Sequence, residues 1–210
     1  ARAEQNAGDW WSSLVKATNI CLREANVSGD AIEAMAYATT CCTVVALDKE
    51  GAPLRPALMW MDVRADKEAE AVLETGDKRL VLNSNGQGPV SAEWMIPKAL
   101  WLKRNEPQIF DDAVTICEYQ DYLTMRLTGE RCASLNNVGL RWHHANRDGG
   151  WATSIIEALL AESQDADPPV VARQVAGVVR LAPPDVRHGV HRPRDVVHPA
   201  RAHAEAPHEP

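Results

Sequence analysis

Apolar and polar residues alternate with a helical period near the start of the chain. Over residues 9–27, the apolar positions from Trp10 to Cys21, including Leu14 and Ala17, recur every three or four residues. This spacing predicts an amphipathic helix with one apolar face. Asp9 precedes the first apolar residue and is a candidate N-cap, because its carboxylate can accept a hydrogen bond from a free backbone N–H.

An extended pattern follows this helix. The runs AIEAMAYATT and CTVVALD are rich in small and β-branched residues, which favour strands. The turn sequence DKEGAP separates CTVVALD from a second apolar run, RPALMW, so these two runs are expected to pair as a β-hairpin. The polar sequence ADKEAEAVLE after the hairpin predicts a helix.

The remaining pattern predicts two further helices and one strand. A helix is expected to begin near Pro97, with Lys98 and Trp101 at helical spacing. The run AVTICEY favours a strand, and YQDYLTMRLTGE predicts a helix that ends at Gly129. Strands grouped with intervening helices indicate an α/β domain with a mixed sheet.

Composition divides the chain near residue 165. All seven Trp lie at or before Trp151, whereas five of the seven His and eight of the thirteen Pro follow Asp167. A Pro-rich segment without large aromatic residues cannot bury enough apolar surface to offset its ordering entropy. We therefore predict a folded unit over residues 1–165. Residues 166–210 are expected to be a disordered tail or an out-of-frame translation of a G/C-rich gene.

Charge and cysteine usage exclude several classes of partner. The net charge of −7 argues against general nucleic-acid binding, which needs an excess of Lys and Arg. No apolar stretch has the length of a membrane span and no signal-like leader opens the chain, so we expect a cytosolic protein without a membrane partner. The five cysteines lack disulfide spacing, which favours reduced thiols. No metal site is expected, because the His residues of the tail have no fixed geometry.

Several stretches, in this order, resemble the N-terminal sugar-binding domain of the FGGY carbohydrate kinases. They are TTCCTVVALDKEGAPLRPALMWMDVRA, SAEWMIPKALWLKRNEPQIF, CEYQDYLTMRLTGE and SLNNVG, and SAEWMIPKAL is most similar to the ribulokinase branch. The resemblance spans residues 4–160. It implies part of an actin-like (ribonuclease H-like) α/β domain, with the Gly-rich stretch NSNGQGPV (83–90) as a mobile loop beside the sugar.

The resemblance also implies a reaction. It implies ATP-dependent phosphorylation of a ketopentose, ribulose-like or xylulose-like, with ATP and Mg²⁺ bound in the complete enzyme. The family's Asp-x-Gly-Thr phosphate loop and Gly-Gly-x-Asp catalytic segment do not occur in this sequence. We therefore expect a fragment that lacks a catalytic residue, binds no cofactor and is inactive alone. A non-catalytic sugar-binding module and an inactive truncated gene product are the alternatives, and the oligomeric state is left open.

The resemblance further implies that side chains at strand ends and in adjoining loops bind the sugar. Asp62 would accept two hydroxyl hydrogen bonds, and Trp60 would pack against the C–H face of the ring. Arg64 would donate to the sugar or hold Asp62; the alternative is a surface Asp–Arg pair of little energy. The ten candidate residues are Thr40, Cys41, Cys42, Trp60, Asp62, Arg64, Glu93, Trp94, Gln120 and Asp121.

Some of these candidates have an equally simple structural explanation. Cys41 and Cys42 are also suitable as small strand residues of a core. Glu93 is also suitable as a first-turn acid of a helix that Ser91 caps. Asp121 is equally suited to capping the helix that follows it.

Overall fold

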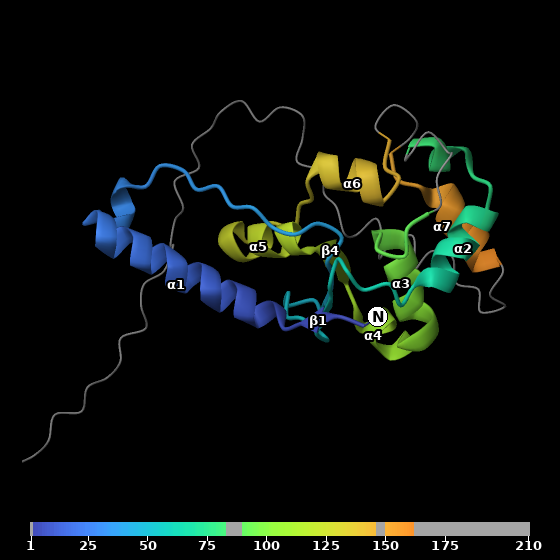
Figure 1. The fold of residues 1–210 in the computed structure, drawn as a ribbon, viewed down its shortest axis with the longest axis horizontal. Helices are drawn as coiled ribbons and strands as arrows, with labels where there is room; N and C mark the ends of the chain where they lie inside the picture. The colour runs from blue at the N-terminus through green and yellow to red at the C-terminus, as the bar shows by residue number, and fades with distance from the viewer. Residues whose placement is uncertain (1, 83–89, 146–149, 162–210) are drawn as a thin grey trace, which may run out of the picture.

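A four-stranded sheet lies between two groups of helices in the computed structural model, which describes residues 2–82, 90–145 and 150–161 (Figure 1). The strands are β1 (Glu4–Gln5), β2 (Val44–Leu47), β3 (Ala57–Leu58) and β4 (Thr115–Glu118), in the order β1-β3-β2-β4. Every pairing among these strands is antiparallel. The prediction of a mixed sheet is therefore wrong for the described residues.

The predicted hairpin is confirmed. Strands β2 and β3 pair through Val44 and Leu58, and the connecting turn is closed by a hydrogen bond from the Asp48 N–H to the Ala52 carbonyl, 3.0 Å. Antiparallel neighbours follow from such a short connection, since parallel neighbours need a long crossover. Gly51 adopts a φ of 82° in this turn, in the left-handed region that glycine tolerates best.

The predicted strand over residues 31–40 does not form. A short 3₁₀ helix, η1 (Gly29–Ala31), is followed by an irregular and mostly exposed segment. Strand propensity reflects how well side chains pack on a half-buried sheet, and no neighbouring strand pairs with this segment among the described residues. Without such a partner, the β-favouring composition does not produce a strand.

The first long helix, α1 (Ala7–Ala25), begins at Asn6 rather than Asp9. The Asn6 side chain accepts a hydrogen bond from the Gly8 N–H, 2.9 Å, and Asp9 lies in the first turn instead. Only the start of the predicted apolar face is buried, at Trp10, whereas Ala17 and Cys21 are exposed. The reason is visible in Figure 1, where the later turns of α1 extend beyond the sheet.

Six further α-helices and a second 3₁₀ helix complete the described fold. Helices α2 (Asp66–Glu74), α3 (Met95–Asn105) and α5 (Tyr119–Thr128) confirm predictions, and Gly129 ends α5 as expected. Pro97 lies in the first turn of α3, where its missing N–H removes no helical hydrogen bond. The pattern did not predict α4 (Pro107–Asp112), α6 (Leu135–Arg141) or α7 (Thr153–Ala161), nor the 3₁₀ helix η2 (Lys78–Leu82).

The core forms around β2 and α3. All four residues of β2 are buried, because β2 contacts α3 and α5, which lie to either side of it (Figure 1). Every residue of α3 from Met95 to Leu102 is buried as well, including a lysine. None of the helices in the described ranges combines the length and the apolar character of a membrane-spanning segment. The predicted tail and the Gly-rich stretch up to Pro89 lie outside the described residues.

Gly129 should be required for the end of α5. It adopts a φ of 77°, and its N–H donates to the Met125 carbonyl, 2.8 Å. Replacing Gly129 with Ala forces a side chain into the left-handed region and should lower the free energy of unfolding by about 1 kcal/mol. Gly29→Ala is the matched control, because Gly29 has no positive φ and a Cβ there would meet nothing within 4 Å. Urea unfolding that shows equal stability losses for both variants would contradict this account.

Candidate functional site

A buried lysine in α3 joins two segments that carry predicted sugar-binding residues. Lys98 is 0% exposed, and its Nζ donates to the carbonyls of Cys42, 2.8 Å, and Met59, 2.6 Å. Lysine is almost never fully buried without partners, so these two carbonyls are what makes its position possible. We call residues 40–43, which precede β2, the Cys42 turn. The two hydrogen bonds of Lys98 hold this turn next to the segment that follows β3.

Glu118 holds the opposite side of Cys42. At the end of β4, its Oε2 accepts the Cys42 N–H, 3.3 Å, while its Oε1 lies 3.9 Å from Nη1 of Arg141. Burial raises the pKa of Glu118, and the Arg141 charge acts in the opposite direction. Cys42 itself has a φ of 56°, which is uncommon for a residue with a side chain. The two peptide groups that flank Cys42 are thus held by a buried base and a buried acid.

A threonine makes a second connection between the same segments. The Thr43 Oγ1 accepts the Trp60 N–H, 3.1 Å, and lies 3.2 Å from the Thr40 Oγ1. The side chains of Thr40 and Cys41 are exposed, and Trp60 is 39% exposed. Four of the predicted residues, from Thr40 to Cys42 and Trp60, therefore belong to two segments that Lys98 and Thr43 hold together.

Asp62 is buried and its carboxylate is already fully hydrogen-bonded. Its Oδ1 accepts the backbone N–H of Arg64, 3.0 Å, and the Arg64 Nε, 2.9 Å. Its Oδ2 accepts the Arg64 Nη2, 2.6 Å, and the Ala3 N–H, 2.7 Å. Burial alone would raise the pKa of Asp62, but the hydrogen bonds from Arg64 and Ala3 outweigh it and lower that pKa. The alternative of a surface pair is wrong, because Asp62 is 0% exposed.

Arg64 acts on Asp62 from a similarly buried position. Its guanidinium also pairs with Glu4, 2.7 Å, and lies over the Trp101 ring, 4.8 Å from the ring centre. This geometry agrees with the expectation that Arg64 holds Asp62. The four lone-pair positions of Asp62 are taken by Arg64 and Ala3. Direct sugar binding by Asp62 or Arg64 stays a prediction.

Asp121 caps α5. Its Oδ2 accepts the Glu118 N–H, 3.2 Å, and its Oδ1 accepts the Ser134 N–H, 3.3 Å. Together with Glu118, the N-cap residue, it forms a capping box, which confirms the capping explanation. The pKa of Asp121 is raised to about 7, chiefly by burial and also by the neighbouring Glu118 charge, while the two N–H donors act in the opposite direction.

Gln120 begins a short chain of hydrogen bonds that leads toward Glu118. We call the group formed by the Cys42 turn, Trp60, Lys98, Glu118 and Arg141 the cluster. Its Oε1 accepts from the Asn137 Nδ2, 3.1 Å, and the Asn137 Oδ1 accepts from the Arg141 Nη1, 3.0 Å. Arg141 in turn faces Glu118. Helix α6 thus orients the one guanidinium that partners the buried Glu118 carboxylate in the described part of the chain.

Glu93 and Trp94 are not tied to the Cys42 turn by hydrogen bonds. The Glu93 N–H donates to the Ser91 Oγ, 3.2 Å, and Trp94 occupies the N-cap position of α3. The interpretation of Glu93 as a first-turn acid capped by Ser91 is therefore wrong, because α3 begins two residues after Glu93. The Trp94 ring packs edge-on against His143, with ring centres 5.8 Å apart.

Several residues that build this cluster were not predicted from the sequence. They are Thr43, Glu118, Asn137 and Arg141, and Lys98 was assigned only to a helix. One signal was present for Lys98, because it is the only charge in the run MIPKALWL. Nothing in the local sequence distinguishes Asn137 and Arg141 from ordinary polar residues of a helix.

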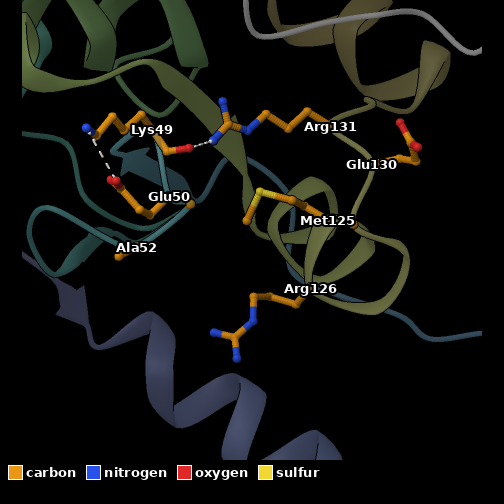
Figure 2. A pocket seen from close by; sticks show the side chains of 9 residues that line it. Lys49, Glu50, Ala52, Met125, Arg126, Glu130 and Arg131 are labelled. Carbon is orange, nitrogen blue, oxygen red and sulfur yellow. Dashed lines mark hydrogen bonds and ion pairs between the residues drawn. The ribbon is translucent and has the colours of Figure 1, made fainter. Parts of the chain in front are cut away.

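A separate pocket lies between the turn after β2 and the end of α5 (Figure 2). Its volume is about 700 Å³, and Figure 2 shows the Arg131 guanidinium donating to the Lys49 carbonyl, 2.6 Å. Lys49 also pairs with Glu50, 3.5 Å. None of the ten predicted residues lines this pocket, so it is distinct from the candidate sugar site.

The comparison with known families decides the family of the chain. A model described as the N-terminal domain of the FGGY family of carbohydrate kinases matches residues 1–181. The chain belongs to the FGGY family of carbohydrate kinases. It is 31% identical over 186 residues to a xylulose kinase of Streptomyces coelicolor, covering 84% of this chain and 36% of that relative. It is 30% identical over 168 residues to Ribulokinase 1 of Staphylococcus saprophyticus, covering 74% and 31%.

Solved structures give the same fold. The xylulose kinase of Bifidobacterium adolescentis superposes with a TM-score of 0.61 at 20% identity, covering 85% of this chain and 39% of that one. The glycerol kinase of Plasmodium falciparum, solved with ADP, superposes with a TM-score of 0.62 at 18% identity, covering 85% and 34%. The described residues thus have the actin-like fold of FGGY sugar kinases, as expected. The chain spans about a third of the length of the curated relatives named above.

FGGY kinases use ATP, whose phosphates and metal ion need suitable binding groups. No group of three or more His, Cys, Asp and Glu side chains within the described ranges could hold a metal ion. The pocket in Figure 2 combines three cations with two carboxylates and lacks a Gly-rich phosphate loop. The described residues therefore do not fit these groups.

Lys98 should be required for the stability of the cluster. Lys98→Met keeps most of the side-chain length but removes the ammonium group. The Cys42 carbonyl loses its Lys98 donor, and the Met59 carbonyl keeps only the Asp62 N–H, 3.0 Å, so the free energy of unfolding should fall by about 2 kcal/mol. Removing the buried charge offsets part of the loss, because burial lowers the pKa of Lys98 to about 8. Lys67→Met on the exposed face of α2 is the control and should change stability by less than about 0.5 kcal/mol. Equal free energies of unfolding for both variants in urea would show that the Lys98 hydrogen bonds do not stabilise the Cys42 turn.

Asp121 should make stability depend on pH. The unfolded chain releases this proton near the ordinary value of 3.8, whereas the folded protein holds it up to about pH 7. The folded state therefore binds more protons in this window, and its free energy of unfolding falls as pH rises. Asp121→Asn does not titrate, so the stability of the unmutated chain relative to this variant should fall by roughly 3 kcal/mol between pH 4 and 7. A constant difference across that range in denaturant titrations would refute the shift.

Proposed function

We propose that this chain forms the sugar-binding side of an ATP-dependent ketopentose kinase. The observation that carries the proposal is the 31% identity with a xylulose kinase over 84% of the chain. A ribulokinase is also among the relatives, and xylulose and ribulose are both five-carbon ketoses. In this proposal, residues 1–165 form the sugar-binding domain. A cytosolic location stays a prediction.

The residues of the cluster have two different tasks in this proposal. Thr40, Cys41 and Trp60 are exposed and face the sugar, Trp60 with an apolar ring and an N–H donor. Lys98 and Glu118 do not touch the sugar but fix the backbone that presents these side chains. Positioning of the acceptor hydroxyl is the contribution of this chain.

Calorimetry tests the binding step directly. Titrating the 210-residue chain with D-xylulose and with L-ribulose should give saturable heat with at least one ketopentose, and much less with an aldopentose such as D-xylose. An ADP-release assay with ATP and Mg²⁺ should show no turnover by the chain alone. Binding without turnover supports the assignment of a sugar-binding side. Absence of heat and of a thermal shift with both ketopentoses would refute the proposal.

Trp60 should contribute to sugar affinity but not to folding. Trp60→Ala removes a partly exposed ring, so the Kd for the bound ketopentose should rise roughly fivefold, equivalent to about 1 kcal/mol. The matched control is Val114→Ala, which truncates a residue that is 44% exposed outside the cluster. Calorimetry should give an unchanged Kd for the control. The same Kd for both variants would remove Trp60 from the site.

A further inference from the structure

Two adjacent thiols occupy the Cys42 turn. Cys41 is exposed and Cys42 is 5% exposed, and neither forms a disulfide. Consecutive α-carbons lie about 3.8 Å apart, and the two side chains are close enough that a hydrogen bond with Cys41 contributes to the raised pKa of Cys42. The pair therefore combines one accessible thiol with one shielded neighbour.

The surroundings of the pair separate the two thiols chemically. Burial raises the pKa of Cys42 to about 12, and the Cys41 charge adds to this, so Cys42 keeps its proton. The Arg141 guanidinium lies close enough for the charges of both thiols to act on it, and its side-chain hydrogen bond is with Cys42. Exposure therefore separates the two thiols, because an exposed thiol meets a dissolved oxidant before a shielded one does. Cys41 is thus placed to react first, with the adjacent Cys42 as the resolving thiol.

We propose that Cys41 and Cys42 form a redox-sensitive dithiol that hydrogen peroxide converts to a disulfide. The Cys41 thiolate attacks one peroxide oxygen; an S–O bond forms, the O–O bond breaks, and the leaving hydroxide takes a proton to become water. The Cys42 sulfur then attacks the Cys41 sulfenic acid; the S–S bond forms as the S–O bond breaks, and the Cys42 proton leaves with the hydroxide as a second water. Two thiols and one peroxide give one disulfide and two waters.

Closing this ring must disturb the cluster. Disulfides usually join α-carbons roughly 4.4–6.8 Å apart, so a bridge between neighbours is strained and readily reduced. Cys42 is held at a φ of 56° by Glu118 on its N–H and by Lys98 on its carbonyl. The ring cannot form without a change in this backbone, so it should weaken one or both contacts. Oxidation would thereby loosen the Cys42 turn from the segment around Trp60.

Peptide mapping after oxidation tests the chemistry. The unmutated chain is treated with hydrogen peroxide, blocked with iodoacetamide and digested. The peptide that contains both cysteines should be unalkylated and lighter by two hydrogen atoms, and dithiothreitol should restore alkylation. Cys21, exposed, and Cys132, half-buried, are internal controls that should remain alkylated. Alkylation of Cys41 after oxidation, or a bridge from Cys41 to any other cysteine, would overturn the proposal.

Two variants separate the order of reaction. In Cys42→Ser the Cys41 sulfenic acid should accumulate and be trapped by dimedone. In Cys41→Ser the remaining Cys42 should show no dimedone adduct under the same conditions. A Cys42 adduct in that variant that forms as fast as the Cys41 adduct would contradict the assigned order.

The consequence for sugar binding rests on the proposed function, whereas the disulfide does not. Calorimetry of the reduced and oxidised chain should show at least a fivefold weaker ketopentose affinity after oxidation, restored by dithiothreitol. Unchanged affinity of a fully oxidised chain would refute the coupling. If the reduced chain binds no ketopentose but the disulfide forms, the proposed function fails and the dithiol stands. If the chain binds ketopentose and no disulfide forms, the dithiol fails alone.

Discussion

The buried ammonium group of Lys98 is the constraint on which the arrangement of the site depends. A charge in the core is strongly unfavourable unless it is hydrogen-bonded, and here the Lys98 Nζ donates from α3 to the carbonyls of Cys42 and Met59. Lys98 needs the two carbonyls, and the two carbonyls are in turn oriented by Lys98. The carbonyls must turn inward to solvate Lys98, and this fixes the two segments that carry Cys41 and Trp60.

A second buried group, Glu118, links this constraint to the fold. It ends β4, begins α5 as the N-cap and accepts the Cys42 N–H, so one side chain connects the sheet, a helix and the site. Arg141 of α6 lies beside the same carboxylate and balances its charge. Removal of one partner from a buried group costs more than the hydrogen bond itself, because the other partner is left unsolvated. Stability and site geometry are therefore not separable at this junction.

The predicted sugar-binding residues lie in two different kinds of environment. The residues that the FGGY resemblance indicates lie in exposed turns, at Thr40, Cys41 and Trp60, or in a buried ion pair, at Asp62 and Arg64. The pair stabilises the segment after β3 by joining it to Ala3 and Glu4 at the first strand. Asp62 is thus held in place by hydrogen bonds from Arg64 and Ala3.

Local sequence was sufficient for the elements whose signals are local. The hairpin at DKEGAP, the helices α2, α3 and α5 and the cap at Gly129 follow from periodicity and turn residues, and the order of the motifs indicated the FGGY family. Tertiary structure alone decided the rest. AIEAMAYATT forms no strand because no strand within the described ranges pairs with it, and Lys98 meets carbonyls 56 and 39 residues away. Hydrogen-bond partners that distant leave no periodic trace in a sequence, because burial of a polar group is decided only when separate segments pack together.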